Sequence, residues 1–339
     1  MIPYLMKVLD GRNLTFSEAT ACADQLMVSG ENPYKVAGLL VALRAKGESY
    51  EEISGFAKGL KNNAVPIAPK RTKFFDIVGT GGDGAHTFNI STTCAFVLAG
   101  AGVNVAKHGN RSISSKCGSA DVLEALGVNI QAGPENIKRQ LDDIGLSFIF
   151  APLAHPSMRN VMEVRKNLGI PTIFNIIGPL SNPIQLEGQC IGVFKPKLVT
   201  QMAKSMYQLG VKMGAVIHGA GGLDEASLAG DNTVAFMKKG NLVMGKINGR
   251  DFGLCQADND ALIGGDAKEN AEILLSILNG ARGPKRDVVL LNAAIALYAF
   301  DLAETIEDGI AQAAHSIDEG HAIEKLNKMI EISNKGGVI

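Results

Sequence analysis

The chain has 339 residues, 46% of them apolar and 20% charged, which is the composition of an ordinary globular protein with room for about two domains. Its 33 basic and 34 acidic residues give a formal net charge of −1. That balance argues against a general binder of nucleic acid, whose affinity comes from clustered cations. It leaves room for a local cationic pocket that binds one small anion.

Cysteine usage and the N-terminus both indicate a reducing compartment. The cysteines are scattered, odd in number and without CxxC spacing, which favours separate thiols over a disulfide framework or a zinc site. The first residues lack the basic stretch and apolar run of a signal peptide, and no uncharged run reaches the roughly 20 residues that span a membrane. We therefore expect a cytoplasmic protein without membrane contact. The cysteines are Cys22, Cys94, Cys117, Cys190 and Cys255.

Residues 1–65 carry the start signals of several helices. Thr15 and Ser49 each begin a capping-box pattern, with a glutamate three positions later. Asn32 places a capping side chain before Pro33 at the first position of another helix. A helical unit of this size can hardly bury all of its apolar faces alone, so it should pack on another domain or on a second copy of itself.

From residue 74 onward, short apolar runs alternate with helical patterns, after a proline-containing linker at 62–73. This alternation predicts an α/β fold in which a small N-terminal helical domain precedes a mostly parallel sheet covered by helices on both faces. The last two predicted strands flank the polar turn 239–241, and such a hairpin makes the edge of the sheet mixed. Strands are predicted at 75–78, 103–106, 148–150, 215–217, 233–236 and 242–247, and helices at 120–126, 134–144, 158–168, 197–209, 267–280, 284–299 and 318–333.

A glycine loop follows the first predicted strand. It reads Gly79-Thr80-Gly81-Gly82-Asp83-Gly84. Glycines let backbone N–H groups approach an anion without obstruction by side chains. Asn89, Ser91 and Thr92 then stand at the start of a helix, where free N–H groups and the helix dipole attract phosphate.

A second polar loop follows the strand 103–106. It begins with Lys107-His108-Gly109-Asn110-Arg111-Ser112, and it continues through four more serines or lysines to the helix 120–126. Because both loops follow strands and precede helices, we expect them to meet at one edge of the sheet, where open α/β sheets bind ligands. The structural alternative is a tight glycine turn and a solvated loop.

Two adjacent acids, Asp224 and Glu225, follow the predicted strand 215–217. Carboxylates at the end of a strand are suitable oxygen ligands for a Mg²⁺ ion that is shared with phosphate. The same pair also fits the acidic start of a helix. Asp83 leaves a similar choice, because an aspartate in a glycine loop either caps that loop or acts at a phosphate site through N–H groups or a metal.

Competing catalytic motifs are missing from the sequence. It contains no GxSxG, HExxH or GxxxxGK[ST], which argues against a serine hydrolase, a zinc protease and a P-loop ATPase. Residues 79–84 formally fit GxGxxG, but Lys107 stands where a dinucleotide-binding enzyme would carry an acid.

Five stretches together resemble the anthranilate phosphoribosyltransferase family, and the likeness spans essentially the whole chain. The stretches are GTGGDGAHTFNIST, KHGNRSISSKCGSADVLEALG, APLAHPSM, FNIIGPLSNP and GLDEAS. The resemblance implies that the phosphoribosyl group of 5-phosphoribosyl 1-diphosphate (PRPP) is transferred to anthranilate in tryptophan biosynthesis. It also implies a homodimer through the helical domain, and that about 158–182 joins 1–65 in that domain, which leaves 74–157 and 183–339 as the large domain.

The same resemblance implies the ligands of the substrates and of Mg²⁺. Anthranilate would contact Gly79, Asn110, His155 and Arg165, and Mg²⁺ would bind Ser91, Asp224 and Glu225. PRPP would contact Gly79, Gly82, Asp83, Thr87, Asn89, Ile90, Ser91, Thr92, Lys107, Ser115 and Ser119. Taken singly, His155 in a loop fits a structural histidine and Arg165 on a helix fits a solvated charge. Members of the family often carry an arginine where this chain has Pro171.

Two alternatives stay open at this point. Pyrimidine nucleoside phosphorylases share the implied architecture and a glycine loop, although their second loop differs. A non-catalytic relative that binds nucleic acid would need a cationic stripe and would lack the acid pair, and the near-neutral charge argues against it. No side chain stands out as a general base.

Overall fold

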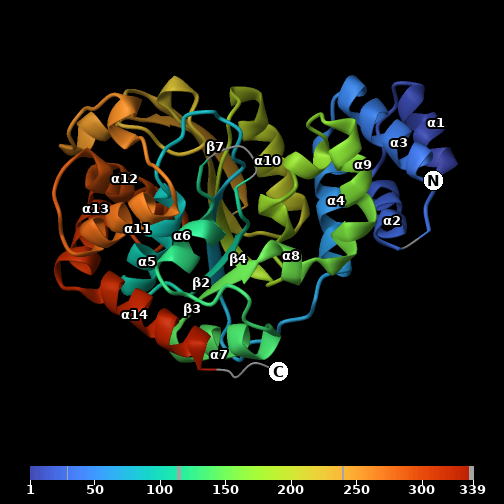
Figure 1. Cartoon of the computed structure of the whole chain (residues 1–339). Coiled ribbons are helices and arrows are strands. Elements are labelled where there is room, and N and C mark those ends of the chain that lie inside the picture. The colour runs from blue at the N-terminus through green and yellow to red at the C-terminus, as the bar shows by residue number, and fades with distance from the viewer. Residues whose placement is uncertain (29, 113–115, 239, 336–339) are drawn as a thin grey trace. The chain divides into compact units, whose positions relative to one another are not determined.

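The computed structural model describes residues 1–28, 30–112, 116–238 and 240–335, and the chain divides into two compact units (Figure 1). No helix among these residues is both long enough and apolar enough to cross a membrane. The first unit comprises Met1–Pro66, Ala151–Pro183 and Lys204–Gly210, and the second comprises Ile67–Phe150, Ile184–Ala203 and Val211–Ile339.

The first unit is helical, and its predicted helix starts are confirmed. The side chains of Thr15 and Ser49 close capping boxes with Glu18 and Glu52, and Asn32 caps the helix that begins at Pro33. The helices are α1 (Ile2–Leu9), α2 (Phe16–Met27), α3 (Pro33–Lys46), α4 (Tyr50–Asn62), α8 (Ala151–Ala154) and α9 (Arg159–Leu168).

Close packing of α2 on α4 forms the centre of this unit. Gly55 and Gly59 of α4 face Ala19 and Ala23 of α2, and a Cβ atom on either glycine would lie within 2.6 Å of an alanine Cβ. The two backbones can approach only because these side chains are absent. The glycines therefore offset their low helix propensity with tight packing.

The second unit contains a seven-stranded sheet among its described residues. The strand order is β3-β2-β1-β4-β5-β6-β7, with parallel pairing from β3 to β5 and antiparallel pairing from β5 to β7. This confirms the predicted fold class, a mostly parallel sheet with a mixed edge. The strands are β1 (Phe74–Gly79), β2 (Val105–Gly109), β3 (Leu146–Phe150), β4 (Leu186–Gly192), β5 (Met213–His218), β6 (Asn232–Lys238) and β7 (Asn241–Ile247).

Helices α5 and α12 form the centre of the core and pack on the strands β1 and β5 (Figure 1). The chain moves across the sheet in one direction from β1 to β3 and in the other from β4 to β5. Right-handed crossovers therefore place α5 and α7 on one face and the start of α10 on the opposite face. The helices are α5 (Ile90–Gly100), α6 (Ser119–Ala125), α7 (Pro134–Ile144), α10 (Pro196–Gln208), α11 (Ala267–Leu278), α12 (Pro284–Ala299), α13 (Ile306–Asp318) and α14 (His321–Asn334).

Three elements differ from the prediction. The sequence pattern does not predict β4, because Glu187, Gly188 and Gln189 interrupt its apolar run. It does not predict α13 either, a helix that occupies the segment between the predicted helices 284–299 and 318–333. Strand β2 ends at Gly109, so Lys107 lies within the sheet and the loop begins later than predicted.

Candidate active site

The site of interest lies where the strand order reverses, at the carboxyl ends of β1 and β4. These neighbouring strands are parallel, and their last residues, Gly79 and Gly192, are paired in register. Successive connections leave this point in opposite directions across the sheet, which opens a crevice beyond the strand ends. The glycine loop after β1 and the acid pair after β5 both begin at this edge.

The two adjacent acids reach different elements of the second unit. The Oδ2 atom of Asp224 accepts a hydrogen bond of 2.6 Å from the backbone N–H of Gly81. The Oε1 atom of Glu225 accepts one of 3.2 Å from the N–H of Ser91, at the start of α5. The acid pair thus links the glycine loop to the N-terminus of a buried helix.

Glycines at the ends of both central strands make room for this arrangement. A Cβ atom on Gly79 would collide with the carboxylate of Asp224, and one on Gly192 would collide with the backbone carbonyl of Asp224. Gly192 was not among the predicted site residues. The sequence does carry a signal for it, because a glycine closes the apolar pair Cys190 and Ile191.

Negative charge is concentrated in the acid loop. The pKa of Asp224 is raised well above its ordinary value by burial, by Glu225 and by Asp83. Burial also raises the pKa of Glu225 to about 7, although Lys107 and the N–H of Ser91 oppose the shift. Carboxylates that are held together in this way favour a proton or a cation between them.

Lys107 is an interior cation beneath the acid loop. Its side chain is only 2% exposed, and its Nζ atom donates to the carbonyl of Ile77 at 2.7 Å and to Oγ of Ser91 at 3.2 Å. Burial lowers its pKa, while Asp76 and Glu225 counteract that shift. Lys107 therefore anchors the start of α5 from within the sheet.

The oxygen atoms of this loop fit a Mg²⁺ ion shared with a diphosphate. The described residues contain no cluster of three or more histidine, cysteine, aspartate or glutamate side chains suited to hold a metal. Mg²⁺ is, however, usually bound through one or two carboxylates together with substrate phosphates and water. Asp224, Glu225 and the hydroxyl of Ser91 provide such a partial set of ligands, and a cation would stabilise the ionised form of these two carboxylates, whose pKa values are raised.

Asp83 behaves as a residue that caps its own loop. Its Oδ1 atom accepts from the N–H of Ala85 at 3.1 Å, and its Oδ2 atom accepts from the N–H of Asp224 at 3.4 Å. The carboxylate thereby joins the glycine loop to the acid loop. Gly82, beside it, has a φ of 83°, which is the left-handed region that glycine adopts without strain.

The start of α5 carries polar side chains that are buried or bonded within the protein. Among the described residues, the buried hydroxyl of Thr92 has no hydrogen-bond partner. Asn89 makes no capping bond, and its side chain instead bonds the carbonyl of Cys117 at 3.3 Å and Nδ2 of Asn270 at 3.1 Å. The side chain of Ile90 is buried in the core, and Thr87 forms an isolated bridge with the extended residue Ile263.

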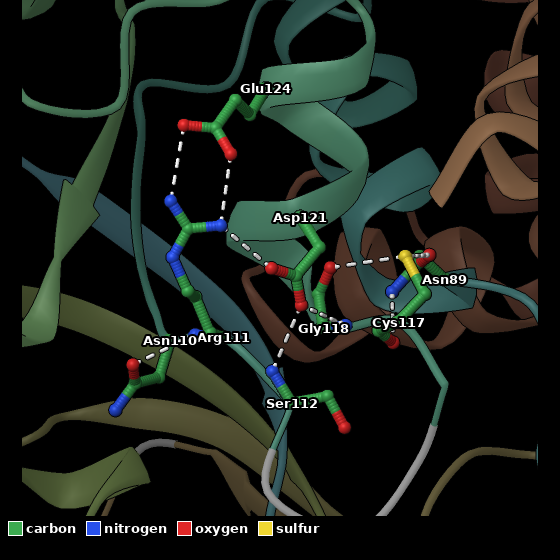
Figure 2. Close-up of polar contacts among 8 residues, drawn as sticks. All are labelled: Asn89, Asn110, Arg111, Ser112, Cys117, Gly118, Asp121 and Glu124. Carbon is green, nitrogen blue, oxygen red and sulfur yellow. Dashed lines mark hydrogen bonds and ion pairs between the residues drawn. The ribbon is translucent and has the colours of Figure 1, made fainter. Parts of the chain in front are cut away.

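The loop after β2 is held by ion pairs and hydrogen bonds to carboxylates of α6, as Figure 2 shows. The Nη1 atom of Arg111 lies 2.9 Å from a carboxylate oxygen of Asp121 and 2.9 Å from one of Glu124. Asp121 also accepts from the N–H groups of Ser112 at 3.0 Å and Gly118 at 2.8 Å. The charge of Arg111 is thus neutralised within the loop, and Asp121 fixes both ends of the segment between residues 112 and 118.

The other predicted ligands on this loop have distinct positions. Oδ1 of Asn110 accepts from the N–H of Arg111 at 2.7 Å, and its carbonyl accepts from Ala120 at 3.2 Å (Figure 2). Ser119 begins α6 and lies against Gly109. Ser115 lies outside the described residues.

His155 and Arg165 belong to the first unit. His155 is 3% exposed, and burial lowers its pKa to about 4 against the opposing effect of the Ser181 and Leu60 backbone, so the ring is neutral at pH 7. The guanidinium of Arg165 is half-buried, 5.4 Å from the ring centre of Phe174. No carboxylate of the described residues lies within ion-pair distance of it.

Comparisons with known proteins agree with this fold. Residues 2–64 match the helical bundle domain of a glycosyl transferase family, and residues 71–323 match its a/b domain. The class of protein is therefore a glycosyl transferase built from these two parts.

Named relatives align with this chain over nearly its full length and over nearly their own. The anthranilate phosphoribosyltransferase of Bacillus cereus (strain B4264) is 48% identical over 98% of this chain and 97% of its own. The enzyme of the same name from Thermus thermophilus superposes with a TM-score of 0.92 at 39% identity, over 97% of this chain and 99% of that one. The Saccharomyces cerevisiae enzyme in complex with PRPP and Mg gives a TM-score of 0.90 at 28% identity, over 99% and 98%. The chain belongs to the anthranilate phosphoribosyltransferase family.

Proposed function

We propose that the protein transfers the phosphoribosyl group of PRPP to the amine of anthranilate, giving N-(5-phosphoribosyl)anthranilate and diphosphate in tryptophan biosynthesis. The observation that carries this proposal is the acid pair, which is lodged against a glycine loop at the reversal point of the sheet. A diphosphate beside such a pair requires a divalent cation, and PRPP offers that group.

For PRPP we propose the ligands that the family resemblance implies. Glycine loops and helix starts bind phosphate through backbone N–H groups. The hydroxyl of Thr92, which has no hydrogen-bond partner among the described residues, supports a phosphate contact at the start of α5. Lys107 and Asp83 would act mainly by holding the loops, because both already bond protein groups. The proposed set is Gly79, Gly82, Asp83, Thr87, Asn89, Ile90, Ser91, Thr92, Lys107, Ser115 and Ser119.

The reaction breaks the bond between C1 of the ribose and the diphosphate oxygen, and the electron pair leaves with diphosphate. The lone pair of the anthranilate nitrogen forms the new C1–N bond, and the nitrogen then loses a proton to water. An aromatic amine is neutral at pH 7, so its nitrogen needs no strong base to attack. The protein's task is to orient both substrates and to stabilise the charge that develops on the leaving group.

Mg²⁺ is the proposed cofactor, with Ser91, Asp224 and Glu225 as its protein ligands. When bound, the ion would neutralise oxygens of the leaving diphosphate. Burial raises the pKa of both carboxylates, which favours a cation beside them. Lys107 holds the hydroxyl of Ser91 in place by donating to its Oγ.

For anthranilate we propose contacts with Gly79, Asn110, His155 and Arg165. The strongest support comes from Arg165, whose half-buried guanidinium stacks on Phe174 and is free of acids among the described residues. Such a group binds a planar carboxylate through two parallel hydrogen bonds. The neutral ring of His155 suits a structural role or contact with an aromatic ring.

The direct test is turnover of the purified protein with Mg²⁺, PRPP and anthranilate, followed through the loss of anthranilate fluorescence. We expect turnover that stops when EDTA removes the metal and returns when Mg²⁺ is added. Phosphorolysis of thymidine or uridine is measured in parallel. Turnover of a nucleoside with none of anthranilate would contradict the proposal.

We also propose a homodimer formed through the helical unit. Apolar side chains of α1 and α3 are exposed in the single chain, among them Ile2 at 51%, Met6 at 53% and Leu9 at 60%. Sedimentation of the wild type and of Met6→Asp would test this, since the charge should shift a dimer toward monomer. The domain boundaries predicted from the sequence and a cytoplasmic location stay proposals with it.

A further inference from the structure

A buried asparagine holds the backbone directly after the acid pair. Asn292 on α12 is 1% exposed, and its Oδ1 atom accepts from the N–H of Ala226 at 2.8 Å. Its Nδ2 atom donates to the carbonyl of Ala226 at 2.8 Å and to that of Val288 at 2.8 Å. One side chain thus satisfies both backbone groups of the residue that follows Glu225.

The same backbone is confined from the side of the sheet. The carbonyl of Asp224 lies against Gly192 at the end of β4, so closely that no Cβ atom could fit there. Residues 224–226 are therefore held between a strand end and the helix α12. Movement toward the strand is blocked by contact, and movement away from it would break the two bonds between Asn292 and Ala226.

A second buried asparagine fixes the remainder of the loop between β5 and β6. Oδ1 of Asn232, a fully buried residue, accepts from the N–H groups of Ala220 at 3.0 Å and Ser227 at 2.7 Å. Its Nδ2 atom donates to the carbonyl of Ser227 at 2.9 Å. Because the backbone on both sides of the acid pair is anchored, the loop between β5 and β6 cannot easily accommodate a shift at Ala226 without moving Asp224 and Glu225.

We propose that Asn292 is a positioning residue that sets the affinity of the acid pair for its divalent cation, an inference that rests on the proposed function. The side chains of Asp224 and Glu225 reach different partners, the N–H groups of Gly81 and Ser91. A displaced Ala226 would move both carboxylates relative to these partners. Residues that orient metal ligands without touching the metal typically change its affinity 10- to 100-fold when they are removed.

The test compares Asn292→Leu with Gln140→Leu, a matched change of a buried helical amide to leucine. Gln140 on α7 is 2% exposed and bonds Ser147 and Asn136, both remote in sequence from the acid loop. Binding of Mn²⁺ in the presence of PRPP is measured by electron paramagnetic resonance, beside the Michaelis constants for Mg²⁺ and anthranilate.

We expect Asn292→Leu to weaken Mn²⁺ binding at least tenfold and to raise the Michaelis constant for Mg²⁺ by a similar factor, with partial recovery of kcat at saturating metal. Gln140→Leu should lose stability but bind Mn²⁺ within about twofold of the wild type. Equal Mn²⁺ affinity in the two variants would overturn the inference. If Asn292→Leu does not fold, Asn292→Ala is measured with the same two outcomes.

The inference and the proposed function fail in different ways. A wild type that binds Mn²⁺ with PRPP but does not turn over anthranilate would refute the function alone. A wild type that turns over normally, with no metal defect in the Asn292 variants, would refute the positioning role alone.

Discussion

The loop after β5 and the loop after β2 are both tied down by buried or partly buried hydrogen bonds, but they balance charge differently. Arg111 of the β2 loop forms ion pairs with Asp121 and Glu124 of α6, so both of these carboxylates contact a cation directly. In the β5 loop, Asp224 and Glu225 have raised pKa values, and Lys107 opposes the rise at Glu225. The carboxylates beside the first loop are paired within the protein, whereas those of the second favour a further cation.

This difference separates charges that stabilise the fold from charges that serve a ligand. Carboxylates that are paired directly with a cation stabilise the folded state without a ligand. Like charges that are held together raise that energy unless a partner arrives, which is the pattern of perturbed pKa values found at functional sites. Arg111 directly follows Asn110, a proposed anthranilate ligand, yet its contacts place it among the charges that stabilise the fold.

The largest effect is expected when the carboxylate charges of Asp224 and Glu225 are removed while the shapes of the two side chains are kept. Asp224→Asn with Glu225→Gln should lower turnover roughly 10²- to 10³-fold, because the developing charge on diphosphate loses its stabilisation. Without Mg²⁺, the same variant should be at least as stable as the wild type at pH 8, since ionising carboxylates with raised pKa values opposes folding. Fluorescence turnover and thermal unfolding measure the two effects.

Glu304→Gln with Glu307→Gln is the control for that experiment, because both side chains are exposed. This control variant should change neither the turnover nor the thermal stability appreciably. Retained Mg²⁺-dependent turnover in the Asp224 and Glu225 variant would remove the metal assignment.

Crowding the acid loop should also cost activity. Gly192→Ala places a methyl group against the carbonyl of Asp224, so we expect a destabilisation of about 3 kcal/mol and a misplaced acid pair. A displacement of that kind can reduce turnover roughly 10²-fold. Gly245→Ala on β7 is the control, because a Cβ atom there meets no atom within 4 Å. Equal behaviour of the two variants in urea unfolding and turnover would contradict the crowding argument.

His155 extends the comparison to a buried group that carries no charge. Its folded pKa of about 4 lies below the ordinary value of 6.5. As pH falls, the unfolded chain therefore protonates His155 before the folded protein does. The stability contributed by the neutral ring is lost as pH falls from about 6.5 to 4. This difference between the folded and the ordinary pKa of His155 corresponds to about 3 kcal/mol of folding free energy.

Urea unfolding at several pH values measures this contribution. His155→Leu should show a shallower loss of stability below pH 6.5 than the wild type. His315→Gln, at an exposed position, should keep the wild-type slope. An unchanged slope in His155→Leu would show that the buried ring does not titrate as its surroundings require.

Arg165 is a half-buried cation in the helical unit with no described carboxylate within ion-pair distance. Arg165→Ala should raise the Michaelis constant for anthranilate about tenfold or more, since a charge-assisted hydrogen bond contributes roughly 1.5–3 kcal/mol. The Michaelis constant for PRPP should change little. Lys166→Ala, an exposed neighbour on α9, is the control. A larger effect on PRPP than on anthranilate would count against the proposed contact.

The smallest effects on stability should come from the carboxylates that hold the loop after β2. Asp121→Ala leaves the N–H groups of Ser112 and Gly118 without their acceptor, which should cost about 1–2 kcal/mol. Glu124→Ala removes an exposed ion pair and should cost less than about 1 kcal/mol. Chemical unfolding distinguishes them, and a larger loss from Glu124→Ala would reverse our view of the loop.

Sequence patterns predict this molecule best where a local signal matches a local cause. The caps at Thr15, Asn32 and Ser49 bond backbone groups of their own helices, so a few neighbouring residues suffice to predict them. The glycine loop and the acid pair are visible for a similar reason, because each follows an apolar strand. The family resemblance adds the identity of the substrates, which no spacing rule provides.

The missed elements depend on distant partners. Gly188 weakens the strand pattern of β4, yet a side chain there would press on Phe75, Met213 and Phe300. Gly309 weakens the helical pattern of α13, yet it lets that helix contact the backbone of Ala294 on α12. Each glycine is unfavourable locally and required by packing, so only the folded structure explains it. Asn292 is similar, since nothing in its neighbourhood of the sequence points to Ala226.

The central claim is that the acid loop holds a divalent cation on a doubly phosphorylated ribose at the carboxyl ends of β1 and β4. A crystal structure of the protein with PRPP and Mn²⁺, with an anomalous difference map calculated at the manganese edge, tests it most directly. We predict a manganese peak that contacts the diphosphate and lies beside Asp224 and Glu225. Diphosphate bound away from the glycine loop, or manganese peaks that avoid both acids, would contradict the account.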